Sequence, residues 1–210
     1  MCSSYISASI HYFRVHPDLW VDRLTKIKAG GYNTIQLYIE WAGHNPQPGT
    51  YNFDGLYDLE AFLTLATELD LYIIVRPGPF IDAEREMGGL PFWLLIDKNI
   101  TLRSSDEAFL SSLSDWYQTL MPKLEPYLLV NGGKILSVQV ENEYSYYGLA
   151  RKKCDKKYLL YIRDLIRRLL GPETFLFSTD PYGLKQLNCS RIPGVYSTCL
   201  LYTSPSPRDS

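Results

Sequence analysis

Two carboxylates and a carboxamide stand together at one point of the chain, as Glu141, Asn142 and Glu143. They follow an apolar run, residues 135–140, whose composition predicts a buried strand of a parallel sheet. In a (β/α) barrel, the carboxyl ends of the strands carry the active site. A glutamate at such a place can act as the acid/base of a glycosidase, and an asparagine beside it can hydrogen-bond a sugar hydroxyl.

Glu143 is therefore the candidate acid/base, and Glu141 is the candidate for a structural hydrogen-bond acceptor. Glycoside hydrolysis uses two carboxyl groups that flank the scissile bond. The alternative for Glu143 is a structural ion pair with Arg76 or Arg14, since buried ion pairs also place charges at strand ends.

Polar and aromatic residues also follow the two preceding predicted strands. Tyr38 ends one strand, and Glu84 lies in the loop after the other, between residues 76–79 (RPGP) and Gly88-Gly89. These Pro and Gly residues predict a loop of fixed shape. The alternatives are a solvated charge for Glu84 and Glu86, core positions for Tyr38 and Trp41, and satisfied structural histidines for His11 and His44.

Strand and helix patterns alternate along the chain, which predicts an α/β fold with a parallel sheet. No Gly-rich phosphate loop follows the first strand, and this argues against a Rossmann fold. The predicted strands are 5–12, 33–38, 71–75, 134–140, 174–178 and 194–198, and the predicted helices are 17–29, 56–69, 106–124 and 154–170.

A closed (β/α)8 barrel needs about 250 residues, and the chain has 210. We therefore predict a TIM barrel truncated after about six strands, with residues 1–198 as a partial catalytic domain. Residues 199–210 are rich in Ser and Pro and aperiodic, and we predict that they form a disordered, non-native tail.

Composition excludes several classes of function. The formal net charge is −2, so nothing favours nucleic acid, and no apolar run approaches the ~20 residues of a membrane span. Residues 1–5 show no signal peptide. The spacing of the four Cys fits no zinc pattern, and we predict neither metal nor cofactor. Asn99 and Asn188 lie in glycosylation sequons.

Five motifs, in the same order, make the chain similar to glycoside hydrolase family 35, the β-galactosidases of the animal acid or lysosomal type. The similarity extends from about Tyr5 to Thr198. The motifs are SASIHYFR (7–14), GYNTIQLY (31–38), RPGP (76–79), GGLPFW (88–93) and VQVENEY (138–144).

The resemblance implies a retaining hydrolase of carbohydrate metabolism that releases terminal β-linked galactose from a glycan or glycolipid. It implies Glu143 as proton donor and general base. The positions that match galactose-binding residues are Tyr38, Ala83, Glu84 and Asn142.

The resemblance also implies features outside the site. Cys154 and Cys189 match a family disulfide, which would stabilise the fold by roughly 3–4 kcal/mol in the loop-entropy model. The family's nucleophile is a Glu on the seventh strand, beyond residue 198. The parent protein is expected in the lysosome or vacuole, or to be secreted.

Two residues depart from the family pattern. Asp82 stands where animal members often have Cys, and Arg85 stands where an aromatic residue is common; both concern the rim of the substrate site. Two alternatives to an enzyme stay open from the sequence. One is a partial barrel without activity of its own, and the other is a non-catalytic galactoside-binding protein that uses Tyr38 and Glu84.

Overall fold

Six parallel strands form the framework of the chain, which a computed structural model describes over residues 4–200. The strands hydrogen-bond in chain order, and each neighbouring pair is parallel. This confirms the predicted α/β class and the half-barrel of six strands. The strands are β1 (Ser7–Ser9), β2 (Thr34–Tyr38), β3 (Tyr72–Arg76), β4 (Ile135–Gln139), β5 (Leu176–Pro181) and β6 (Tyr196–Leu200).

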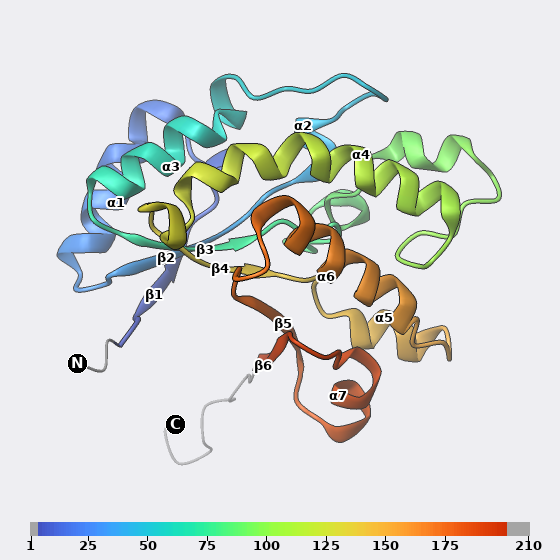
Figure 1. Cartoon of the computed structure of the whole chain (residues 1–210). Coiled ribbons are helices and arrows are strands. Elements are labelled where there is room, and N and C mark those ends of the chain that lie inside the picture. The colour runs from blue at the N-terminus through green and yellow to red at the C-terminus, as the bar shows by residue number, and fades with distance from the viewer. Residues whose placement is uncertain (1–3, 201–210) are drawn as a thin grey trace, which may run out of the picture.

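The long helices α1, α3, α4 and α6 lie together on one side of the sheet (Figure 1). Because every crossover returns the chain to a neighbouring parallel strand, the carboxyl ends of all six strands meet at one edge. The helices are α1 (Trp20–Ala29), α2 (Trp41–His44), α3 (Leu59–Glu68), α4 (Glu107–Leu124), α5 (Tyr144–Ala150), α6 (Lys156–Leu170) and α7 (Leu184–Ser190).

Aspartates cap three of the long helices. The carboxylate of Asp106 accepts from the backbone N–H of Phe109 at 3.1 Å, as the sequence predicts for the start of α4. Asp58 and Asp155 do the same for α3 and α6. Each cap satisfies an N–H that the helix itself leaves unpaired, and such a cap stabilises a helix by about 1 kcal/mol.

The core lies between the sheet and these helices. Alternate residues of β2 show this, because Ile35 and Leu37 are fully buried whereas Gln36 between them is only half-buried. Side chains of a strand point alternately to its two faces. One face of the sheet is therefore packed against helices, and the opposite face, which would line the interior of a barrel, is partly open.

The first predicted strand is wrong in length, because β1 ends at Ser9 instead of Tyr12. Residues Tyr12–Arg14 form a 3-10 turn in which the N–H of Val15 bonds to the carbonyl of Tyr12. Beside this turn, the ring of His11 accepts from the backbone N–H of Tyr38 at 3.2 Å.

Three short helices, α2, α5 and α7, were not predicted from the sequence, because segments of four to seven residues show too little helical periodicity. At the other end of the chain, β6 extends to Leu200, two residues past the predicted boundary of the tail. The rest of that tail, 201–210, lies outside the described residues.

A disulfide joins Cys154, just before α6, to Cys189 in α7, as the family resemblance implied. Gly148 of α5 lies against it, since a Cβ at this position would meet Cys189 Sγ at 2.8 Å. The disulfide thus ties together the segments that follow β4 and β5. Within residues 4–200, no helix is long and apolar enough to span a bilayer.

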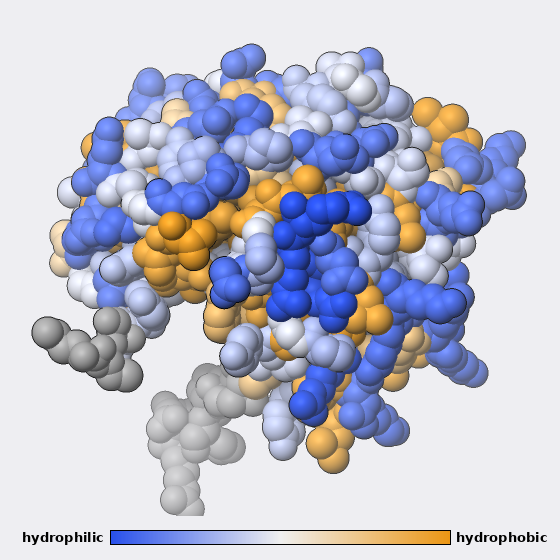
Figure 2. Space-filling model, in the orientation of Figure 1, coloured by the Kyte–Doolittle hydropathy of each residue, from blue (hydrophilic) through white to orange (hydrophobic). Residues whose placement is uncertain are grey.

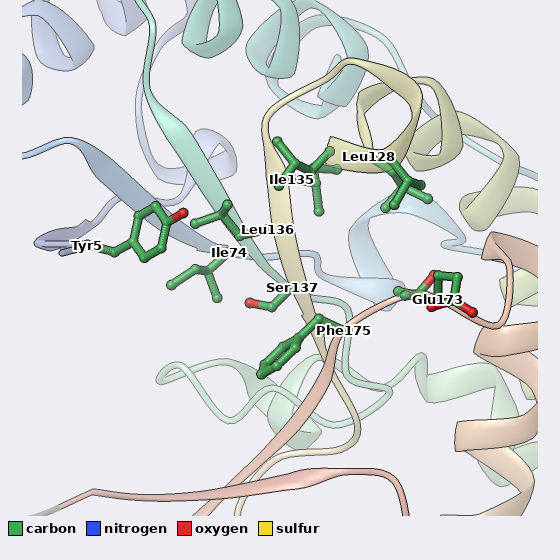
Figure 3. Close-up of a pocket in the computed structure, with 11 residues that line it drawn as sticks. Tyr5, Ile74, Leu128, Ile135, Leu136, Ser137, Glu173 and Phe175 are labelled. Atoms are coloured by element: carbon green, nitrogen blue, oxygen red, sulfur yellow. The ribbon is translucent and has the colours of Figure 1, made fainter. Parts of the chain in front are cut away.

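An apolar hollow of about 450 Å³ lies at the amino-terminal end of the strands (Figure 3). Its lining includes Tyr5 before β1, Ile74 and Leu136 on the open face of the sheet, and Phe175 before β5. Nearby Val130 is 66% exposed, and Figure 2 shows apolar side chains gathered on this part of the surface. The hollow contains none of the candidate site residues, which are at the opposite ends of the strands.

His44 makes the fold sensitive to acid. Its Nε2 lies 2.5 Å from the hydroxyl of Tyr12, and its Nδ1 lies 2.7 Å from the carbonyl of Asn52. Burial lowers the pKa of His44 from its usual value of 6.5 to about 4, since burial disfavours the charged ring. The unfolded chain thus binds the proton more readily than the folded chain.

We expect His44 to cost stability as pH falls from 6.5 towards 4, on the order of 3 kcal/mol in total, and to have no effect above 6.5. Unfolding by urea at a series of pH values measures this loss. The variant His44→Gln should show a smaller loss over the same window, and an identical pH profile would contradict the assignment.

Candidate active site

The carboxyl ends of β2, β3 and β4 bring three polar residues together. Tyr38 pairs with Arg76 in the β2–β3 register, and the Arg76 guanidinium lies 4.2 Å from the centre of the Tyr38 ring. Asn142, just after β4, accepts from Arg76 Nη2 at 2.7 Å and from the Tyr38 hydroxyl at 3.5 Å. The sequence prediction that these strand ends converge is therefore confirmed by the fold.

Asn142 is held in one orientation. Its carboxamide oxygen faces Arg76 and also accepts from Gln139 Nε2 at 3.2 Å, and its nitrogen donates to the carbonyl of Ile81 at 3.4 Å. Arg76 in turn donates to Gln139 Oε1. Because the positions of its oxygen and nitrogen are fixed by neighbours, this side chain is preorganised for a polar ligand.

The backbone after β4 is strained on both sides of Asn142. Glu141 has φ +59° and Glu143 has φ +48°, a left-handed region that costs non-glycine residues on the order of 1–3 kcal/mol each. The N–H of Glu141 donates to the carbonyl of Gly78, and that of Glu143 to the carbonyl of Thr179. Strain that is held by surrounding contacts in this way is typical of functional sites.

Glu141 has a structural role. Arg103 donates to both of its carboxylate oxygens, at 2.9 and 2.7 Å, and the hydroxyl of Tyr158 donates to Oε1 at 2.7 Å. Arg103 also donates to the carbonyl of Asn142 at 2.8 Å. With the Arg103 side chain 7% exposed and that of Glu141 1% exposed, this ion pair is buried. It holds the backbone that carries the next two residues.

Glu143 differs from Glu141 in its surroundings. It is half-buried, and no basic side chain within residues 4–200 lies at ion-pair distance from its carboxylate. The structure therefore does not contain the alternative ion pair of Glu143 with Arg76 or Arg14. Burial raises the pKa of Glu143, and the negative charge of Asp82 adds to this, while Arg76 opposes it. A carboxyl group that keeps its proton more readily is suited to general acid catalysis.

Ala83 and Glu84 lie in a second strained segment, the loop after β3. Asp82, Ala83 and Glu84 have φ values of +59°, +53° and +49°. Arg14, from the turn after β1, donates to the carbonyl of Ala83 and to Glu84 Oε2, the latter at 3.2 Å. The Glu84 side chain is 89% exposed, so its carboxylate stays open to solvent beside Arg14.

Two residues of the site region could not be identified from the sequence. Arg103 lies within the long segment between β3 and α4, and nothing in its neighbourhood distinguishes it from a surface arginine. Glu40 follows β2, and its buried ion pair with Arg85 joins residues 45 positions apart. Both sequon asparagines, Asn99 and Asn188, are exposed.

The chain matches the sequence model of a protein family described as glycosyl hydrolases family 35, over residues 2–208. It is 51% identical over 195 residues to the beta-galactosidase-1-like protein of Mus musculus and 50% identical over 194 residues to the beta-galactosidase of Felis catus. These alignments cover 92% of this chain but 29% and 28% of the two relatives. The chain thus spans less than a third of the length of these relatives.

Solved structures with low sequence identity share the fold. A GH5_18 protein from Streptomyces cattleya, in complex with GlcNAc, superimposes with a TM-score of 0.64 at 16% identity, over 84% of this chain and 44% of that one. The exo-beta-1,4-mannosidase Op5Man5 from an Opitutaceae bacterium gives a TM-score of 0.60 at 18% identity, over 83% of this chain and 31% of that one. At this identity the likeness concerns the fold alone, and it agrees with a truncated (β/α)8 barrel.

Proposed function

The chain belongs to glycosyl hydrolases family 35, and from that membership we propose that it forms the acid/base part of a retaining β-galactosidase site. The reaction is the release of terminal β-linked galactose. The observation that carries the proposal is the half-buried carboxyl group of Glu143, which has a raised pKa and stands beside the fixed carboxamide of Asn142.

Each site residue has a role in this proposal. Glu143 protonates the glycosidic oxygen as the bond breaks and later removes a proton from the attacking water. Asn142 hydrogen-bonds a hydroxyl of the galactose ring. Tyr38, the backbone at Ala83 and the carboxylate of Glu84 bind the other side of the sugar, from the two neighbouring strand ends.

The retaining mechanism needs a second carboxylate as nucleophile, about 5–5.5 Å from the first. Family resemblance assigns this role to a Glu on the seventh strand, outside residues 4–200. In this proposal, the described half-barrel supplies proton transfer and most of the galactose contacts, and the nucleophile completes the site.

The substrate in this proposal is a β-galactoside of a glycan or glycolipid. The Cys154–Cys189 disulfide supports an oxidising compartment, since such bonds are rare where thiols are kept reduced. A lysosomal, vacuolar or secreted protein fits this, and exposed Asn99 and Asn188 are then candidates for glycosylation.

Titration of the ¹⁵N-labelled chain with galactose tests the sugar site. We expect a dissociation constant on the order of 1 mM, with chemical-shift changes at the amides of Tyr38, Glu84 and Asn142. Tyr38→Phe removes one hydrogen bond and should weaken binding roughly three- to tenfold. Tyr32→Phe, at a residue that is 39% exposed and outside the site, is the matched control.

Glucose, the C4 epimer of galactose, is the matched control ligand. Binding of glucose and galactose with equal affinity would contradict a galactose site. Shift changes confined to other parts of the chain would contradict the placement of the site at these strand ends.

A further inference from the structure

We propose that Glu40 is a positioning residue for the loop of residues 82–89, which it fixes through its ion pair with Arg85. The inference rests on the proposed function, because this loop carries Ala83 and Glu84, two of the proposed galactose-binding residues. Glu40 itself follows β2 and does not belong to the loop. It would therefore act on the sugar through Arg85 and not by direct contact.

The ion pair between Glu40 and Arg85 is short, and its acidic partner is much more buried than its basic partner. Arg85 Nε lies 2.6 Å from Glu40 Oε1, and the side chain of Glu40 is 4% exposed whereas that of Arg85 is 35% exposed. The hydroxyl of Tyr57 donates to the other oxygen of Glu40 at 3.4 Å. A buried carboxylate needs a partner cation, and within residues 4–200 Arg85 is the basic residue at ion-pair distance.

The loop also closes directly over Glu40. Gly89 has φ +83°, and a Cβ there would lie 3.5 Å from Glu40 Cγ and 2.9 Å from Ile81 Cγ1. The absence of a side chain at Gly89 lets the backbone of the loop approach the buried carboxylate. Glu40 is thus enclosed by the segment that it pairs with.

The conformation of the loop requires such an anchor. Four of its non-glycine residues have positive φ: Asp82, Ala83, Glu84 and Met87. A strained backbone persists only where the surrounding contacts determine it. Within the loop, the N–H of Ile81 donates to the carbonyl of Gly88 at 2.8 Å, and the N–H of Gly88 donates to the carbonyl of Arg85 at 2.9 Å. The second of these bonds thus includes the residue that pairs with Glu40.

The second anchor of the loop is weaker. Arg14 pairs with Glu84 at 3.2 Å, but these side chains are 37% and 89% exposed. Exposed ion pairs contribute little because water and salt screen them. Arg14 also donates to the carbonyl of Ala83. Of the two ion pairs that join the loop to the barrel within residues 4–200, the one between Glu40 and Arg85 is the more buried.

The test is the variant Glu40→Gln in the full 210-residue chain, with two readouts. Hydrogen–deuterium exchange should rise about tenfold or more at the amides of Arg85 and Gly88, because the loop opens locally. The galactose dissociation constant should rise about tenfold to hundredfold, because the loss of a hydrogen bond from the sugar to a charged group such as Glu84 has effects of this size.

Controls separate positioning from general stability. Glu86→Gln removes a charge from the same loop, and Glu60→Gln breaks an ion pair of the same length, 2.6 Å to Lys123, away from the site. Neither should change exchange at Gly88 or galactose affinity. Arg85→Gln should open the loop at least as much as Glu40→Gln, because it leaves the Glu40 carboxylate buried without its cation. The double variant should be no weaker than Arg85→Gln alone.

The outcomes distinguish this inference from the proposed function. Unchanged exchange at residues 82–89 in Glu40→Gln would overturn the anchor, whether or not sugar binds. Increased exchange with unchanged galactose affinity would overturn its role in positioning the sugar-binding residues. If the wild-type chain binds no galactose and the loop of the Glu40→Gln variant still exchanges faster, the proposed function is overturned and the anchor stays in place.

Discussion

Glu143→Gln is expected to lower kcat/KM about 10²–10⁴-fold for galactosides with poor leaving groups, the range that a general acid contributes. The measurement uses a chimera in which residues 5–198 replace the matched segment of a full-length family relative, so that the rest of the barrel is present. Glutamine keeps the size of the side chain but carries no proton that it can transfer. The leaving oxygen would then depart as an anion.

The choice of substrate makes this test specific for an acid/base. A dinitrophenyl galactoside needs no protonation of its leaving group, so formation of the galactosyl-enzyme should be nearly unaffected by Glu143→Gln. Added azide needs no general base and should restore the second step. Glu86→Gln, in an exposed loop position, is the matched control and should retain full activity.

Two results would count against the assignment. An equal loss for activated and unactivated galactosides would mean that Glu143 supports the structure and not proton transfer. A folded chimera that binds galactose but hydrolyses none, even before mutation, would favour the galactoside-binding alternative.

Arg103→Met is expected to lower the free energy of unfolding by about 3–5 kcal/mol, because it leaves the carboxylate of Glu141 buried and without a counterion. Urea unfolding monitored by Trp fluorescence measures this loss. The double variant Arg103→Met with Glu141→Gln should recover most of it, since a neutral amide needs no counterion and can still accept the bond from Tyr158.

A surface arginine provides the comparison. Arg23 pairs with Asp22 at 2.6 Å, but these side chains are 46% and 43% exposed, so Arg23→Met should change stability by less than about 1 kcal/mol. Equal losses for Arg23→Met and Arg103→Met would contradict the view that the buried pair supports the Asn142–Glu143 segment. A double variant no more stable than Arg103→Met would contradict it too.

Much of the fold was determined by local sequence. The alternation of apolar strands with periodic helices predicts the parallel sheet. The capping residues Ser104-Ser105-Asp106 predict the start of α4. The apolar strand before Asn142 and Glu143 predicts that both lie at the carboxyl end of the sheet, and they follow the end of β4 in the structure. These signals are readable because each depends on residues a few positions apart.

Other features were decided only by the tertiary structure. The partner of Glu141 is Arg103, 38 residues away, and the partner of Arg85 is Glu40, 45 residues away. No spacing in the sequence encodes such pairs, because they form only when loops from different strands meet at one edge of the sheet.

The orientation of Glu143 also belongs to the tertiary structure. By strand periodicity, the side chains of Glu141 and Glu143 would share one face. However, β4 ends at Gln139, and the backbone of both glutamates is in the left-handed region. Their carboxylates consequently have different surroundings. Arg103 and Tyr158 donate hydrogen bonds to that of Glu141, whereas burial and the charge of Asp82 raise the pKa of Glu143. The sequence thus determined which residues stand at the candidate site, whereas long-range contacts decided which glutamate pairs with an arginine and which has a raised pKa.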